Sequence, residues 1–284
     1  MVMTRSIIAA AAALVLTAGS AFAAGGEIEI KRHTWSFGGM GGHYDKNQLQ
    51  RGFQVYREVC AACHSLNRIS FRNLVQSGGP EFPKNAVEAL AKEYEVDAAP
   101  DDEGEVKKRP AKLSDKFPPL YANEQAARAI HNGALPPDLS VMAKARGVAF
   151  VGPWYIHPWA MLKDIVAGYQ EGGADYIAAL MTGYKEAPKK MKMAEGMKYN
   201  TYFPGHQIAM TNPFAAGDGQ VTYQDGTPAT VENYAKDVAA FLSWSSDPTL
   251  NQRKKMGWQV LIYLLITSLL LYVAKRRVWG NVKH

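Results

Sequence analysis

The sequence predicts a mainly α-helical exported domain with long loops and insertions, followed by one transmembrane helix near the C-terminus. Three observations support this fold class. The chain begins with a short apolar segment of the kind that directs export, and several later segments carry apolar residues at helical spacing. A stretch of 19 uncharged residues then precedes a basic tail. We therefore expect a signal peptide at 1–23, an exported domain at 24–247, and an anchor with a short cytoplasmic tail at 248–284.

The first segment has the parts of a secretory signal peptide. Arg5 supplies the positive charge, residues 7–16 form a short apolar stretch, and the sequence Ala-Phe-Ala at 21–23 fits a cleavage site. This pattern is typical of a signal peptide rather than of a membrane span. A mature chain that starts near Ala24 is therefore expected to be delivered across a membrane.

The uncharged stretch at 256–274 is long enough to cross a membrane. At about 1.5 Å rise per residue, a helix of this length spans roughly one hydrocarbon core. Basic residues flank both ends, and Trp258 and Tyr272 stand where aromatic side chains meet the membrane interface. The signal peptide orients this span, so the bulk of the chain is expected outside the cytoplasm.

The net charge is unevenly distributed along the chain. The whole chain has a formal net charge of +6, but seven basic residues and no acids follow position 247. Residues 24–247 hold 24 basic and 26 acidic side chains, so the exported domain is mildly acidic. It contains no basic patch with interleaved aromatic residues, and nucleic-acid binding is therefore not expected. A mildly acidic domain suits a basic partner.

The exported domain has segments of helical spacing separated by long loops. Asp45 can cap a helix with Gln48 at the capping-box position, and the face Leu49, Phe53, Tyr56 and Cys60 continues this helix along the chain. Residues 147–170 are apolar and aromatic, which indicates an inserted helix on the surface or in the membrane interface. The other expected helical segments are 86–95, 124–130, 173–184 and 229–248.

Residues 93–105 contain seven acids and no base. Such a run is typical of a solvated loop. It is also typical of an electrostatic docking surface when it lies beside a functional site. The local sequence is compatible with both interpretations.

Residues 60–64 read Cys-Ala-Ala-Cys-His and hold the only two cysteines of the chain. Cys-x-x-Cys-His is the pattern for covalent attachment of a c-type haem. Each thiol adds across one haem vinyl group to form a thioether, and the next residue, His64, projects toward the iron. A thioredoxin-like pair would need strand signals around it, and a zinc site would need two further ligands nearby. The pattern therefore predicts one haem c held by Cys60, Cys63 and His64.

The ligand on the second face of the iron decides what the haem does. An open site suits a peroxidase or a gas sensor, whereas a filled His/Met site favours electron transfer and raises the reduction potential. Met210 lies in a Pro/Gly-bounded loop and is the favoured ligand, because a loop can approach the iron without helix register. Met142, which follows a Pro-Pro loop, is the alternative methionine, and Met40, His131 and His206 also remain possible.

Five segments and the single C-terminal anchor carry a resemblance to a known family. The segments are RGFQVYREVCAACHS, KLSDKFPPLYANEQAARAIHNGALPPDLSVMAKAR, GADYIAALMTGY, YFPGHQIAM and DGTPATVENYAKDVAAFLSW. Together they resemble the cytochrome c1 family, the haem subunits of cytochrome bc1 complexes, over nearly the whole mature chain. The combination of NGALPPDLS with YFPG and its downstream methionine is the most specific part.

The resemblance implies a c-type cytochrome fold and a set of haem contacts. It places the sixth iron ligand on the methionine after YFPG, which is Met210, and a propionate-pairing arginine at Arg146. Here His131 stands where the family mostly has asparagine, a difference that would alter polar contacts near the haem edge. The positions that match the walls of the family's haem pocket are Tyr56, Tyr121, Pro137 and Tyr176.

The resemblance also implies partners and a location. The domain would accept an electron from a Rieske iron–sulfur protein and pass it to a soluble cytochrome c or c2, with its anchor beside cytochrome b. The complex, expected to be dimeric, would act as a quinol–cytochrome c oxidoreductase in the bacterial inner membrane, with the haem domain in the periplasm. The chain itself would carry electrons without acid–base or nucleophilic catalysis.

Two other functions are compatible with the motif. One is a free-standing, membrane-anchored c-type cytochrome or an oxidase subunit, which shares the chemistry but has different partners. The other is a haem peroxidase or a ligand sensor, which would keep the second face of the iron open.

Overall fold

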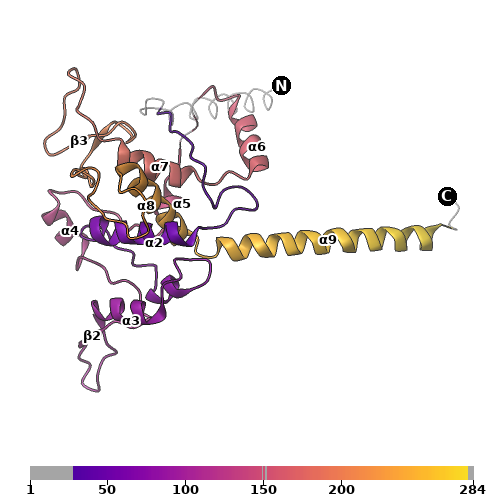
Figure 1. Cartoon of the computed structure of the whole chain (residues 1–284), viewed down its shortest axis with the longest axis horizontal. Helices are drawn as coiled ribbons and strands as arrows, with labels where there is room; N and C mark the ends of the chain where they lie inside the picture. The colour runs from indigo at the N-terminus through magenta and orange to yellow at the C-terminus, as the bar shows by residue number, and fades with distance from the viewer. Residues whose placement is uncertain (1–27, 149, 151, 281–284) are drawn as a thin grey trace, which may run out of the picture.

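The computed structural model describes residues 28–148, 150 and 152–280. The predicted signal peptide at 1–23 and the last residues of the predicted tail, 281–284, lie outside them. Within the described ranges the chain is mainly helical, with two small antiparallel sheets, and helix α9 (Leu250–Trp279) extends away from the other elements (Figure 1). The mainly α fold class with one apolar C-terminal helix is therefore confirmed.

Helix α2 (Lys46–Val55) begins where the sequence predicts. The Asp45 carboxylate accepts the backbone N–H of Gln48 at 2.7 Å, which satisfies one of the free donors in the first turn. Leu49 and Phe53 are buried on the expected face. The helix then widens into a π-helical turn, η2 (Tyr56–Cys60), which leads into the Cys-x-x-Cys-His segment.

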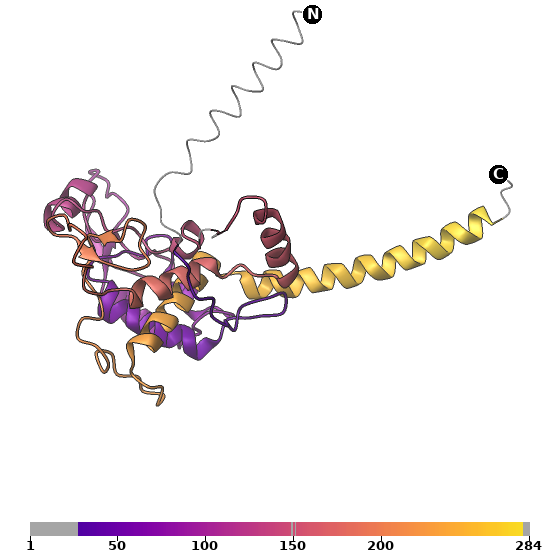
Figure 2. The same cartoon turned by 90° about the horizontal axis from the view of Figure 1, so that it is seen from above.

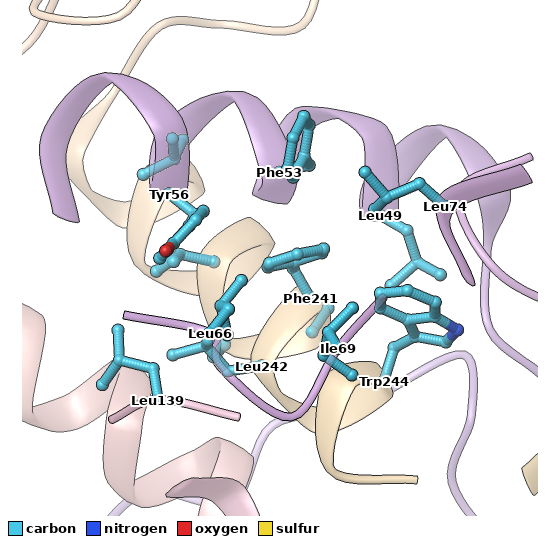
Figure 3. Packing of buried hydrophobic residues seen from close by; sticks show 14 of the residues in the cluster. Leu49, Phe53, Tyr56, Leu66, Ile69, Leu74, Leu139, Phe241, Leu242 and Trp244 are labelled. Atoms are coloured by element: carbon cyan, nitrogen blue, oxygen red, sulfur yellow. The ribbon is translucent and has the colours of Figure 1, made fainter. Parts of the chain in front are cut away.

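Helix α8 (Val231–Ser246) packs on α2 and forms the centre of the core with it. Gly52 permits the close approach, because a Cβ atom at this position would lie 2.1 Å from the backbone oxygen of Asp237. Phe53 packs on Phe241 with ring centroids 5.5 Å apart, and Phe241 packs on Trp244 at 5.5 Å (Figure 3). Each such buried ring stabilises the fold by roughly 1.5–3 kcal/mol.

The remaining elements surround the α2–α8 pair. Helix α7 (Gly172–Thr182) and the short α5 (Met142–Ala145) pack on α8, and α4 (Glu124–Ile130) has the bounds that the sequence predicts. The other helical elements are η3 (Phe71–Val75) and α3 (Lys84–Lys92). One sheet pairs β1 (Glu95–Asp97) with β2 (Lys108–Pro110), and the other pairs β3 (Lys198–Tyr199) with β4 (Gln207–Ile208).

The acidic segment 93–105 begins as one strand of a hairpin, so it is not a loop throughout. Helix α3 ends at Lys92, short of the predicted Glu95, because the Tyr94 carbonyl accepts the N–H of Ala111 at 2.9 Å and the chain turns into β1. Several acidic side chains of segment 93–105 form ion pairs with nearby basic side chains. These pairs are Glu93 with Arg57, Asp97 with Lys108 and Asp101 with Lys107.

Helix α9 (Leu250–Trp279) contains the predicted membrane span at 256–274. It is long and apolar enough to cross a membrane, and none of its most apolar 18-residue window is buried against the rest of the protein. Its first turns are hydrogen-bonded to the loop before α2. Asn251 accepts the backbone N–H of Tyr44 at 3.0 Å, and the Lys254 ammonium donates to the Phe37 carbonyl at 2.6 Å.

Helix α6 (His157–Ala167) lies inside the predicted insertion at 147–170, and none of its residues is buried. Figure 2 shows it near the point where α9 leaves the helical domain. A helix on the outside of the domain is therefore confirmed for these residues.

Candidate functional site

The Cys-x-x-Cys-His segment forms a tight turn at the end of η2. The π-helical bond from the Ala61 N–H to the Tyr56 carbonyl, 2.8 Å, widens the last turn. The Cys60 carbonyl then accepts the N–H groups of both Cys63 and His64, at 3.1 and 2.9 Å. Because one carbonyl receives both donors, the chain folds back and keeps the two thiols and the imidazole in one turn. Both cysteines are free and half-buried, and the Cys60 thiol is the part of that residue that lies inside the protein.

The imidazole of His64 is held in one tautomer. Its Nδ1 atom lies 2.7 Å from the carbonyl oxygen of Pro137, and because a carbonyl can only accept, the proton sits on Nδ1. Burial lowers the pKa of His64, which favours the neutral ring with a lone pair on Nε2. The Tyr56 hydroxyl donates to the His64 carbonyl at 3.0 Å and fixes the backbone. A neutral, oriented imidazole of this kind suits an axial ligand of haem iron.

Asp138 connects the motif to the loop that carries Pro137. Its carboxylate accepts the Ser65 hydroxyl at 2.9 Å and the Asn67 N–H at 2.8 Å. The Leu139 N–H donates to the Ser65 carbonyl at 2.9 Å and completes the connection. Sequence reasoning did not assign a role to this aspartate. The sequence feature that could have identified it is its position in the PPDLS segment, directly after two prolines and before a leucine that is buried.

Tyr121 and His131 form a polar pair near the motif. The Tyr121 hydroxyl lies 2.6 Å from His131 Nε2. Burial, and to a smaller extent the nearby Cys63, raise the pKa of the Tyr121 phenol. His206 is also engaged, because its Nδ1 atom donates to the Asn200 carbonyl at 3.3 Å. Both histidines that the sequence leaves as possible iron ligands therefore already hold hydrogen bonds within the protein.

Met210 lies in a loop that is fastened to the end of α7. Its carbonyl accepts the hydroxyl of Tyr184 at 3.2 Å, and its side chain is partly exposed. Upstream, the fully buried Asn200 donates to the Leu180 carbonyl at 2.8 Å. Gly183 makes room for this contact, because a Cβ atom there would lie 2.6 Å from the Asn200 amide oxygen. The loop can thus present a thioether from a fixed backbone.

Arg146 and Tyr176 lie on the same side as the methionine loop. Arg146 follows α5 and is exposed, and no carboxylate within the described ranges lies within 4.0 Å of its guanidinium. Tyr176 is buried in α7 beside Ile30 and Ala179. Burial raises the pKa of Tyr176, and the positive charge of Arg146 partly offsets this effect, which indicates that the two side chains are neighbours.

The expected site residues therefore fall into two groups. Tyr56, Tyr121 and Pro137 gather around the cysteine motif, whereas Arg146 and Tyr176 lie toward the methionine loop. Helix α8 packs on α2, which leads into Tyr56 and the cysteine motif, and on α5 and α7, which lead to Arg146 and carry Tyr176. No hydrogen bond between described residues joins the two groups directly.

The donor set fits a covalently bound haem better than a redox dithiol or a zinc site. Burial raises the pKa of the Cys60 thiol to about 12, whereas a redox-active cysteine needs a lowered pKa. No group of three or more His, Cys, Asp or Glu side chains within the described ranges is arranged to hold a metal ion. The free thiols, the His64 lone pair and the Arg146 guanidinium match two thioethers, an axial ligand and a propionate partner.

Comparisons with known proteins identify the family of the chain. The model of the Cytochrome C1 family matches residues 35–282. Cytochrome c1 of Blastochloris viridis is 50% identical over 88% of this chain and 86% of its own length. Cytochrome c1 of Rhodospirillum rubrum is 38% identical over 100% of this chain and 99% of its own. The chain is 46% identical, over 87% of its length, to the Cytochrome b/c1 of Bradyrhizobium diazoefficiens, of which it spans 35%. With the family model and these relatives covering most of its length, the chain belongs to the cytochrome c1 family.

Proposed function

We propose that this chain is the haem-bearing electron-transfer subunit of a cytochrome bc1 complex. The observation that carries the proposal is the Cys-x-x-Cys-His turn with the His64 imidazole fixed by Pro137. Membership of the cytochrome c1 family supports it, as does a relative from Candida albicans that is named as a catalytic subunit of a mitochondrial cytochrome b-c1 complex. A bound haem c would supply a one-electron iron couple.

The protein's own residues would hold and tune that group. Cys60 and Cys63 would bind it covalently, and the side chains of His64 and Met210 would ligate its iron. Arg146 would pair with a propionate through its two N–H donors. Tyr56, Tyr121, Pro137 and Tyr176 would wall the pocket and limit water access. A filled His/Met site keeps small ligands off the iron and raises the potential, so electrons alone would enter and leave.

Membership of the family supports a proposal for the partners. The exported domain would receive an electron from a Rieske iron–sulfur protein and deliver it to a soluble cytochrome c or c2, while α9 would lie beside cytochrome b. The match to a protein named cytochrome b/c1 supports the pairing with cytochrome b. The haem domain would face the periplasm of the bacterial inner membrane in a dimeric complex. The complex as a whole would be the quinol–cytochrome c oxidoreductase, with this chain as its electron carrier.

A redox-titrated optical spectrum of the purified membrane complex tests the proposal. It should show one c-type haem together with b-type haems, and the reduced c haem should not bind carbon monoxide. Cytochrome b and a Rieske protein should purify with this chain. A chain that purifies without them would support the free-standing carrier, and carbon monoxide binding would support the peroxidase or ligand sensor.

A further inference from the structure

Helix α6 and the residues before it expose an unusual amount of apolar surface. The exposed fractions are 80% for Trp154, 72% for Trp159, 71% for Ile165 and 70% for Val166. Apolar patches of this kind on a water-soluble domain mark surfaces that contact a protein or a membrane. The proposed electron transfer makes no use of this helix.

The orientation of α6 about its own axis is fixed by the contacts on its other side. The Asp164 carboxylate receives two hydrogen bonds from the guanidinium of Arg32, at 2.7 and 3.0 Å. Ala160 and Asp164, one turn apart, are the α6 residues that are partly covered by the domain. Leu162 and Val166 are each two residues from Asp164, so a helix of about 3.6 residues per turn carries them on the opposite side. The apolar side chains therefore face away from the domain.

The end of α6 lies next to the start of the membrane helix. Gly168, which ends α6 with φ 67°, approaches the loop before α2: a Cβ atom there would lie 3.2 Å from the Met40 nitrogen. The same loop accepts hydrogen bonds from the Lys254 ammonium of α9, at 2.6 Å from the Phe37 carbonyl and 2.5 Å from that of Gly39. One loop thus connects the end of α6 to the basic turn just before the uncharged span.

The direction of α6 suits a membrane surface. In both views α6 lies at the end of the domain from which α9 emerges, and its axis runs across that of α9 (Figures 1 and 2). Because α9 crosses the bilayer in the proposed arrangement, a helix that lies across it at this level is roughly parallel to the membrane plane. Amphipathic helices with tryptophan on the apolar side and a charged opposite side lie in the interface in this way.

We propose that α6 is a monotopic interfacial helix. Trp159, Leu162, Ile165 and Val166 enter the boundary between the lipid headgroups and the acyl chains beside α9. Trp154 and Tyr155 lie at the headgroup level, where amphipathic aromatic rings are favoured. The Arg32–Asp164 ion pair holds the helix to the domain, so α6 and α9 together fix the tilt of the haem domain on the membrane. The inference rests on α9 spanning the bilayer and goes beyond electron transfer.

Spin labelling of the whole membrane protein tests the proposal. Ile165→Cys on the apolar side and Glu103→Cys in the acidic segment are each labelled with a nitroxide, and Trp159→Cys provides a second apolar position. The purified complex is reconstituted in vesicles of phosphatidylcholine and phosphatidylglycerol. Collisions of each label with oxygen, which concentrates in lipid, and with a water-soluble nickel chelate are then measured. An unchanged haem spectrum shows that each variant is folded.

The ratio of oxygen to nickel collisions should be several-fold higher at positions 165 and 159 than at position 103. Equal ratios would overturn the proposal, because they would place α6 in water. Low collision rates with both reagents would also overturn it, since they would show that a protein partner covers the helix. The wild-type chain, treated in parallel, tests the haem proposal separately, because thiols bound to haem take up no label.

Discussion

The Nδ1 atom of His64 lies 2.7 Å from the carbonyl oxygen of Pro137, although 73 residues separate them in the chain. This contact joins the Cys-x-x-Cys-His turn to the PPDLS segment, and it fixes both the tautomer and the plane of the imidazole. Metal-bound histidines usually donate their second ring N–H to such a partner, which raises the basicity of the ligating nitrogen. Two remote parts of the sequence thus act together at one side chain.

Replacement of the proposed sixth ligand should change both the potential and the spectrum. In Met210→Leu, loss of the thioether should lower the reduction potential, let carbon monoxide bind the reduced haem and stop turnover of the complex. A redox titration followed by optical absorbance measures the first effect. The matched control is Met142→Leu, at the alternative methionine, which should keep the potential. If instead the Met210→Leu variant kept the wild-type reduction potential and the Met142→Leu variant changed it, the ligand would be Met142.

Removal of the Arg146 charge should lower the reduction potential while leaving both axial ligands in place. A cation beside a propionate favours the electron-rich ferrous state, so Arg146→Gln destabilises that state. The nearby Lys144, whose ammonium already pairs with Asp247 at 3.3 Å, provides the control variant Lys144→Gln. Equal shifts in the two variants would show that Arg146 acts only as a distant charge rather than as a propionate partner.

Asp138→Asn should destabilise the domain by about 1–3 kcal/mol, because an amide cannot accept all the hydrogen bonds that this carboxylate receives. One carboxylate oxygen accepts the Ser65 hydroxyl and the Asn67 N–H, and the other accepts the Ser140 N–H, so the amide leaves the donors on one side without an acceptor. Denaturant unfolding of the haem-loaded protein, followed by the haem absorbance, measures the change. Asp102→Asn, at an exposed position of the acidic segment, should have little effect. An equally stable Asp138→Asn protein would show that the contacts of Pro137 and Leu139 hold the loop to the motif without this carboxylate.

The exposed acids of the hairpin should accelerate docking of a basic cytochrome c. The ion pairs leave Glu95, Asp102, Glu103 and Glu105 without a basic side chain within 4.0 Å in the described ranges, and the last three lie together between β1 and β2. Changing these three to Asn, Gln and Gln should slow cytochrome c reduction by about tenfold at low salt. The effect should shrink near 0.1 M salt, where the Debye length is about 10 Å. Stopped-flow kinetics at several ionic strengths measure it.

A charge-matched control separates local docking from net charge. Glu29, Glu88 and Glu232 are exposed acids outside the hairpin, and changing all three to Gln removes the same charge. This variant should keep most of the wild-type rate. If both triple variants are equally slow, or if the hairpin variant matches the wild type at every ionic strength, segment 93–105 is a solvated surface without a docking role.

Features that depend on short-range sequence rules could be predicted. The Asp45 cap, the bounds of Glu124–Ile130 and the buried face of α8 follow from capping chemistry and apolar spacing. The apolar character of 147–170 was enough to predict a surface helix there. The haem motif and its axial histidine follow from five consecutive residues, 60–64.

Features that depend on pairing between distant segments could not be predicted from the sequence. Part of the acidic segment forms strand β1 because the N–H of Ala111, from a later part of the chain, donates a hydrogen bond to the Tyr94 carbonyl. The hydrogen bond from Tyr184 to Met210 and the bonds that Asp138 receives likewise join segments that no local pattern relates. The π-helical turn before Cys60 has no signature in apolar spacing, since it adds one residue to a helical turn.

The covalent bond between the chain and a porphyrin is the claim on which the functional account depends. The most direct measurement extracts the denatured protein with acidified acetone and then records its spectrum in alkaline pyridine. The account predicts that the porphyrin stays with the polypeptide and that its reduced spectrum is that of a haem with both vinyl groups saturated, one through Cys60 and one through Cys63. A porphyrin that leaves with the solvent would contradict it.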